Sequence, residues 1–159
     1  MFAMAGARYV HNVLVNRLLG IMYREFRRPC QSLPSDMRVN VSKRGFFYPD
    51  VVALCGKPEF RNDEHLDTLL NPSVIVEVSP PSSELWDRGR KFEQYRTIDS
   101  LREYVLVSAE RISIDLYTRQ PDGRWLLTAL DSLEQSLDLQ SVGCKIPLAE
   151  LYDKIDFDA

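Results

Sequence analysis

Hydrophobic positions change their spacing along the chain, and each spacing predicts a different element. The first segment repeats its apolar residues at helical intervals, with basic residues between them, which predicts an amphipathic helix that ends near Pro29. The apolar stripe of this helix consists of Val10, Val13, Leu14, Ile21 and Phe26. Residues 36–41 instead alternate apolar and polar side chains, which is typical of a strand. After a turn at residues 42–45, we expect a second strand over Phe46–Cys55 that pairs with the first in a hairpin.

The middle of the chain contains a charged segment and then a continuous apolar run. Residues 56–71 are expected to form a loop, in which Leu66–Leu70 makes a short helical turn before Pro72. Ser73–Ser79 is rich in β-branched residues and has no regularly polar face, which is typical of a central strand covered on both sides. The pattern therefore places this strand in the interior of a sheet.

The second half of the chain predicts one helix followed by more strands. The proline pair at residues 80–81 ends the apolar strand, Ser82 or Ser83 can cap a helix, and Glu84 suits its first turn. An apolar strand follows at residues 102–108, and residues 111–130 read as a hairpin that turns at Pro-Asp-Gly. The remainder offers an edge strand and a short closing helix at residues 148–155.

This order of elements predicts an α/β fold, with a mixed β-sheet flanked by helices. The chain has 159 residues, which suits one compact domain with a single core, and we expect one domain over residues 1–159. No repeat or low-complexity linker divides it.

Composition narrows the class of protein. The content of 45% hydrophobic and 27% charged residues is ordinary for a soluble globular protein, and no apolar stretch is long enough to span a membrane. The first residues lack the features of a signal peptide. Cys30, Cys55 and Cys144 are scattered and without metal-ligand spacing, so we expect buried thiols in a reducing compartment rather than disulfides. A cytoplasmic location follows from these expectations.

The charge balance argues against an indiscriminate nucleic-acid coat. The formal net charge is −3, whereas proteins that coat nucleic acids are normally basic. Basic residues do cluster at Tyr23–Pro29 and Asp87–Lys91. Clusters this short usually lie on solvated helix faces, although a local basic groove is compatible with them.

Two apolar strands each carry one carboxylate, Asp50 in the first and Glu77 in the second. Because alternate residues of a strand share a face, Glu77 lies with Ile75 and opposite the valines. A buried carboxylate has to be protonated, paired or bound to a metal. If the strands are neighbours, the two acids converge and suit Mg²⁺ or Mn²⁺. A buried ion pair with Arg or Lys, or a strand end that reaches water, is the alternative.

The following helix adds a stripe of polar side chains. Asp87, Lys91 and Tyr95 recur at steps of four and therefore share one helical face. The stripe is either an exposed ion pair beside a packed aromatic ring, or it directs Lys91 toward the two carboxylates. In the second case the ammonium would stabilise charge on a phosphate and orient a water molecule.

These motifs, in their order, resemble the Uma-two family of restriction-endonuclease-like proteins in the PD-(D/E)XK nuclease superfamily. The resemblance covers roughly Gly6 to Phe157 and implies a restriction-endonuclease-like mixed β-sheet flanked by helices. The motif positions are Pro49-Asp50, Glu77-Val78, Asp87, Lys91, Tyr95 and Glu103-Tyr104. Members of the family usually begin with a further segment, and this chain starts almost at the first helix.

The resemblance implies roles for the motif residues. Asp50 and Glu77 would bind Mg²⁺ or Mn²⁺, with the carbonyl oxygen of Val78 as a further ligand. The superfamily usually has a lysine two residues after the second acid, where this chain has Ser79. In the family pattern the lysine lies on the following helix, and Lys91 matches it.

Three further residues would assist this centre. Asp87 and Tyr95 would orient the lysine or contact the substrate, and His11 matches a histidine at the start of the family's first helix. A histidine held only by packing is the alternative for His11.

The function implied is hydrolysis of DNA phosphodiester bonds by a magnesium-dependent endonuclease, with Asp50, Glu77 and Lys91 as the catalytic residues. The alternative is a catalytically inactive nuclease-fold module that binds nucleic acid or a protein partner. A symmetric homodimer is the natural way for a single nuclease domain to cut both strands of a duplex. No membrane association is expected.

Overall fold

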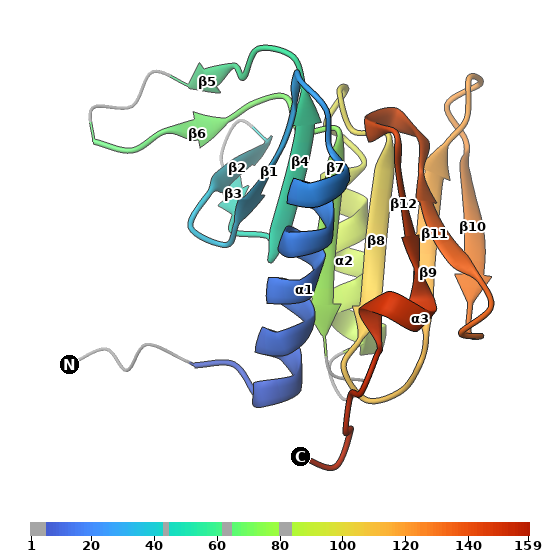
Figure 1. Cartoon of the computed structure of the whole chain (residues 1–159). Helices are drawn as coiled ribbons and strands as arrows, with labels where there is room; N and C mark the ends of the chain where they lie inside the picture. The colour runs from blue at the N-terminus through green and yellow to red at the C-terminus, as the bar shows by residue number, and fades with distance from the viewer. Residues whose placement is uncertain (1–5, 43–44, 62–64, 80–83) are drawn as a thin grey trace.

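A six-stranded sheet forms the central layer of the protein (Figure 1). The computed structural model describes residues 6–42, 45–61, 65–79 and 84–159. The strand order is β1-β4-β7-β8-β9-β10, in which β7 and β8 run parallel and the other neighbours run antiparallel. These strands are β1 (Cys30–Pro34), β4 (Val51–Cys55), β7 (Val74–Ser79), β8 (Glu103–Ser108), β9 (Ile114–Arg119) and β10 (Trp125–Leu130).

Helix α1 (Tyr9–Glu25) covers one face of this sheet (Figure 1). Its buried residues recur at helical spacing and pack on the valines of the central strands: Val10, Leu14, Leu18, Ile21 and Met22. The same face is covered by the hairpin of β11 (Ser136–Leu139) and β12 (Cys144–Pro147) and by α3 (Leu148–Leu151). The predicted first helix is therefore confirmed, and Val10, Leu14 and Ile21 of its predicted stripe are buried in the core.

The opposite face carries helix α2 (Glu84–Tyr95) and a second, four-stranded sheet. That sheet has the order β3-β2-β6-β5. Its strands are β2 (Arg38–Ser42), β3 (Gly45–Phe47), β5 (Phe60–Arg61) and β6 (Thr68–Leu69). A second apolar cluster lies between these elements and the central sheet, so both faces of the central strands are buried.

Strand β7 is apolar at most positions because both of its faces are buried. Val74, Val76 and Val78 point into the cluster beneath α1, and Ile75 points into the cluster on the α2 side. The predicted central strand is confirmed, and the alternation places Glu77 on the α2 side.

The predicted strand Phe46–Cys55 is wrong as one continuous element. Its first residues form β3, which pairs with β2 in the expected hairpin, whereas β4 belongs to the central sheet. The division falls at the buried Pro49, which has no N–H to donate to a ladder. The chain therefore changes sheets immediately before Asp50.

Other differences concern elements that depend on distant partners. The helical turn predicted over Leu66–Leu70 is wrong, because Thr68–Leu69 forms β6, which pairs with β2 and β5. Strands β1 and β5 had no predicted counterpart. The expected edge strand near the C-terminus pairs instead in the separate hairpin β11–β12, and the closing helix is limited to α3. The caps proposed at Ser82 or Ser83 lie outside the described residues.

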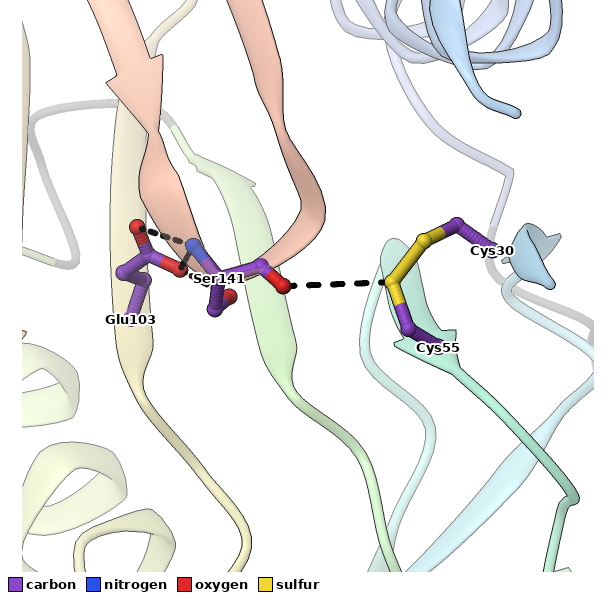
Figure 2. The surroundings of a disulfide bond; sticks show 4 residues. All are labelled: Cys30, Cys55, Glu103 and Ser141. Carbon is purple, nitrogen blue, oxygen red and sulfur yellow. Dashed lines mark hydrogen bonds between the residues drawn. A yellow bond between two sulfur atoms is a disulfide. The ribbon is translucent and has the colours of Figure 1, made fainter. Parts of the chain in front are cut away.

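The expectation of unpaired thiols is wrong for two of the three cysteines. Cys30 and Cys55 form a disulfide between β1 and β4, because the strand register places these residues directly opposite each other (Figure 2). A separation of 25 residues and an unpredicted β1 concealed this pairing in the sequence. Cys144 is free and buried, as expected.

The disulfide lies beside a polar contact between two other elements. The carbonyl oxygen of Ser141 is 3.8 Å from the Cys55 sulfur, and the Ser141 N–H donates to the carboxylate of Glu103 at 3.2 Å (Figure 2). Burial raises the pKa of Glu103, while the hydrogen bonds from Ser141 lower it. This carboxylate is therefore held by backbone and side-chain donors of the segment after β11.

Among the helices that the structure describes, none is both long and apolar enough to cross a membrane.

Loss of the disulfide is expected to lower the free energy of unfolding. The disulfide closes a loop of 25 residues and so lowers the conformational entropy of the unfolded chain. This effect stabilises the folded protein by about 3 kcal/mol. Urea denaturation of the oxidised protein and of the Cys30→Ser/Cys55→Ser variant should show this difference. The reducing agent dithiothreitol should destabilise the wild type and leave the double variant unchanged. Equal stability of the two proteins would contradict the prediction.

Candidate active site

The two acids singled out in the sequence lie on neighbouring strands. Val51 of β4 pairs with Val76 of β7 in an antiparallel register, and one step further along both strands brings Asp50 opposite Glu77. The expectation that the two strands are neighbours is therefore confirmed. Glu77 is only 6% exposed, whereas Asp50 is partly exposed at the end of its strand.

Two donors fix the carboxylate of Asp50. Its Oδ2 accepts the backbone N–H of Val78 at 2.7 Å, and its Oδ1 lies 3.2 Å from Nε2 of His11. The hydrogen bond that His11 donates to Asp50 is the main cause of the raised pKa of His11, and it outweighs the opposing effect of burial. The first turns of α1 thus bring His11 into the site. A histidine held only by packing would not need this contact with Asp50.

Helix α2 supplies the contacts to Glu77. The hydroxyl of Tyr95 donates to Oε1 at 2.9 Å, and Nζ of Lys91 lies 3.9 Å from Oε2. The structure therefore directs Lys91 and Tyr95, one turn apart, toward the same carboxylate. The side chain of Asp87, the third member of the predicted stripe, lies outside the described part of the structure.

The electrostatics of Glu77 differ from those of an ordinary surface acid. The pKa of Glu77 is raised to about 7: burial raises it most, the nearby Lys91 lowers it, and the neighbouring Asp50 raises it. The pKa of the Tyr95 hydroxyl is also raised, by burial and by Glu77, so Tyr95 remains a hydrogen-bond donor. The site therefore holds a proton or a cation more readily than isolated carboxylates would.

The donor set of the site fits a hard divalent cation. Asp50 and Glu77 present oxygen atoms side by side, and a cation between them would relieve their repulsion. Within the described residues, no cluster of three or more His, Cys, Asp and Glu side chains forms a metal-binding group. Two carboxylates are nevertheless a usual protein contribution to Mg²⁺, which keeps several water ligands. The Val78 carbonyl remains a predicted further ligand.

The alternative of a buried ion pair describes this arrangement less well. The Lys91 side chain is 40% exposed, and its ammonium is at the outer limit of ion-pair distance from Glu77. Such a contact compensates little of the cost of burying a carboxylate. The Lys91 side chain therefore remains partly open to solvent.

Two features of the site had no clear signal in the sequence. The ring of Phe47 packs edge-on against Tyr95, with 5.4 Å between the ring centroids, and so supports the hydroxyl that binds Glu77. A cavity of about 530 Å³ also adjoins His11, and Arg8, Ala109, Glu110 and Phe157 help to line it. These residues come from distant segments, and nothing in their spacing predicted that they meet.

Comparison with known proteins agrees with this geometry. Residues 1–149 match the Uma2 family, described as "Putative restriction endonuclease". The chain belongs to the Uma2 family. The resemblance inferred from the ordered motifs is confirmed.

Relatives of the chain extend over most of its length. Uncharacterized protein slr1290 of Synechocystis sp. is 30% identical over 159 residues, which are 99% of this chain and 82% of that protein. Uncharacterized protein sll1609 of the same organism is 35% identical over 128 residues, which are 79% of this chain and 72% of that protein.

A solved structure shares the fold at low sequence identity. A protein from Anabaena variabilis, described as a putative nuclease belonging to DUF820, superposes with a TM-score of 0.72 at 9% identity. The match covers 95% of this chain and 84% of the other. The predicted restriction-endonuclease-like fold is confirmed, and the chain is a Uma2 protein with a nuclease fold.

Replacement of Glu77 by Gln is expected to stabilise the metal-free protein. The raised pKa of Glu77 means that folding favours its protonated form, so stability is lost as pH rises from about 4.5 through 7. With EDTA at pH 8, Glu77→Gln should raise the free energy of unfolding by about 2 kcal/mol, since it removes the charge but keeps an acceptor for Tyr95. Denaturation curves at pH 5 and pH 8 would measure this effect.

The exposed Glu134→Gln variant is the matched control and should show neither the gain nor the change in pH dependence. A Glu77→Gln variant that is less stable than the wild type at pH 8 would contradict this account of the site.

Proposed function

We propose that this Uma2 protein is a Mg²⁺- or Mn²⁺-dependent endonuclease that hydrolyses phosphodiester bonds of DNA. The observation that supports the proposal is the cross-strand pair of Asp50 and Glu77, with Lys91 of α2 directed toward it. A buried acid, Glu77, next to a second carboxylate and a half-exposed amine is costly for stability and is typical of a functional site.

Asp50 and Glu77 would hold the metal, with the Val78 carbonyl as a further ligand. When bound, the metal would polarise the phosphate and lower the pKa of a coordinated water molecule. The chain prepares the site for it: the Val78 N–H and His11 hold the two oxygens of Asp50, and Tyr95 holds one oxygen of Glu77.

Lys91 would stabilise negative charge on the phosphate and help to orient the nucleophile. Its side chain is exposed enough to contact a substrate while its amine stays within 3.9 Å of Glu77. Tyr95 is fully buried and therefore acts through Glu77 rather than on the substrate. Asp87 is proposed to orient Lys91 from the preceding turn of α2, and a symmetric homodimer remains the proposed form for cutting duplex DNA.

A catalytically inactive module that binds nucleic acid or a protein partner is the second candidate. It is favoured because, among the described residues, the centre has two carboxylates and no larger metal-binding cluster. The two candidates differ in metal binding and in cleavage, and each can be measured separately.

Cleavage assays are expected to show metal-dependent hydrolysis that requires the acid pair. Asp50→Asn, which keeps an acceptor for the Val78 N–H, and Glu77→Gln should each lower the cleavage rate with Mn²⁺ by at least about 100-fold. Lys91→Ala should lower it about 10- to 100-fold, since an electrostatic contact to the phosphate is lost. Plasmid and linear DNA, with Mg²⁺, Mn²⁺ or EDTA, would provide the measurement.

The exposed Asp138→Asn variant on β11 should cleave like the wild type. Absence of cleavage by the wild type with either metal, or cleavage by Glu77→Gln at the wild-type rate, would overturn the proposed activity.

Metal binding itself is expected to depend on the same pair. Isothermal titration calorimetry should detect Mn²⁺ binding by the wild type and a large loss of affinity in Asp50→Asn and Glu77→Gln, since each removes one anionic ligand. Unchanged affinity in both variants would place the bound metal elsewhere. Salt-sensitive DNA binding without any Mn²⁺ binding would favour the inactive module.

A further inference from the structure

The four-stranded sheet has one face in the core and one face turned outward. Val39, Phe47 and Leu69 of this sheet belong to the apolar cluster on the α2 side. Because alternate residues of a strand point to opposite faces, Arg38 of β2 and Phe46 of β3 lie on the outer face. Tyr48 directly follows β3 and is half exposed, as is Phe46, with exposures of 49% and 48%.

The strand register arranges outer residues in a row. Val39 pairs with Phe47, so the next step brings Arg38 opposite Tyr48. On the other side of β2, Arg38 pairs with Thr68 of β6, and Thr68 pairs with Arg61 of β5. The row therefore reads tyrosine, arginine, threonine, arginine across the sheet.

Contacts within this face hold the side chains in place. The Phe46 and Tyr48 rings meet edge to face, with 6.2 Å between their centroids. The Arg38 guanidinium lies 4.5 Å from the centre of the Phe46 ring, and its Nε donates to the hydroxyl of the buried Thr68 at 2.7 Å. Two aromatic rings are thus exposed side by side in fixed orientations, which an isolated surface aromatic would not show.

The outer face lies close along the chain to the candidate active site. Tyr48 precedes Asp50 by two residues, which is roughly 7 Å along an extended chain. Phe47, between Phe46 and Tyr48, packs on Tyr95 from the inner side. Strand β4 begins at Val51, directly after Asp50. A strand of nucleic acid at Asp50 and Glu77 would reach this face with its adjacent nucleotides.

We propose that the outer face binds unpaired nucleobases and phosphates of a single-stranded segment next to the cleaved bond. We call this surface the aromatic face, and it consists of Arg38, Phe46, Tyr48 and Arg61. Aromatic side chains bind single strands by stacking on bases, and arginines attract the phosphates. In a duplex the base faces are already stacked on one another and do not reach such rings. This inference rests on the proposed nuclease function and assigns it a substrate class: DNA that is single-stranded or has unpaired ends.

Binding measurements without metal test the aromatic face apart from catalysis. Fluorescence anisotropy in EDTA would compare a labelled single-stranded oligonucleotide with the blunt duplex of the same sequence. Tyr48→Ala and Phe46→Ala should each weaken single-strand binding about tenfold, with a change of less than about twofold for the duplex. Tyr48→Phe keeps the ring and should bind like the wild type.

Tyr23→Ala is the matched control, because Tyr23 is 87% exposed on α1 and lies outside this face. It should leave binding of both ligands unchanged. Both test residues are half exposed, so thermal unfolding of the alanine variants should resemble that of the wild type. This comparison separates lost stacking from lost folding.

Three results would overturn the aromatic face as a nucleic-acid site. The first is an equal loss of affinity for single-stranded and duplex DNA in the alanine variants, and the second is unchanged single-strand binding in both variants. The third is no single-strand binding by the wild type, in which case a protein would be the partner of this face. The outcome is independent of cleavage. If the wild type never cleaves DNA but Tyr48→Ala loses single-strand binding, the proposed activity fails and the aromatic face stands.

Discussion

The antiparallel pairing of β4 with β7 is the interaction on which the rest of the site depends. It places Asp50 opposite Glu77, and every other polar contact of the centre is made to one of these two side chains. Since side chains alternate along a strand, a slip of one residue would turn one acid toward α1 and the other toward α2. The apolar residues on both faces of these strands prevent such a slip, so the core itself sets the geometry of the carboxylates.

This arrangement has a cost that the fold only partly compensates. Glu77 is almost completely buried, and its contacts are one hydroxyl and one distant ammonium, while Asp50 lies beside it. A protein selected for stability alone would place an apolar residue at position 77, as it does at positions 75 and 76. A destabilising acid among well-packed elements is what the proposed metal-binding role of Glu77 requires.

Sequence patterns predicted the elements that carry strong local signals. Three elements encode their structure within a few residues: the stripe of α1, the apolar run of β7 and the Pro-Asp-Gly hairpin of β9 and β10. The acids within apolar strands also pointed to a shared site. Two-residue strands such as β5 and β6 have no period of their own, since only their partners define them. The disulfide was missed for the same reason, because it arises from the register between β1 and β4, whose cysteines are 25 residues apart.

The position of the disulfide has a consequence for how the central sheet opens. Cys30 and Cys55 join one end of the β1–β4 ladder, and Pro34 pairs with Val51 at the other end. A ladder closed covalently at one end can fray only from the other, so transient opening of this edge begins next to Asp50. The end of the β1–β4 ladder next to Asp50 is therefore the end that can move. The end at the disulfide stays closed, and the two strands pivot about it.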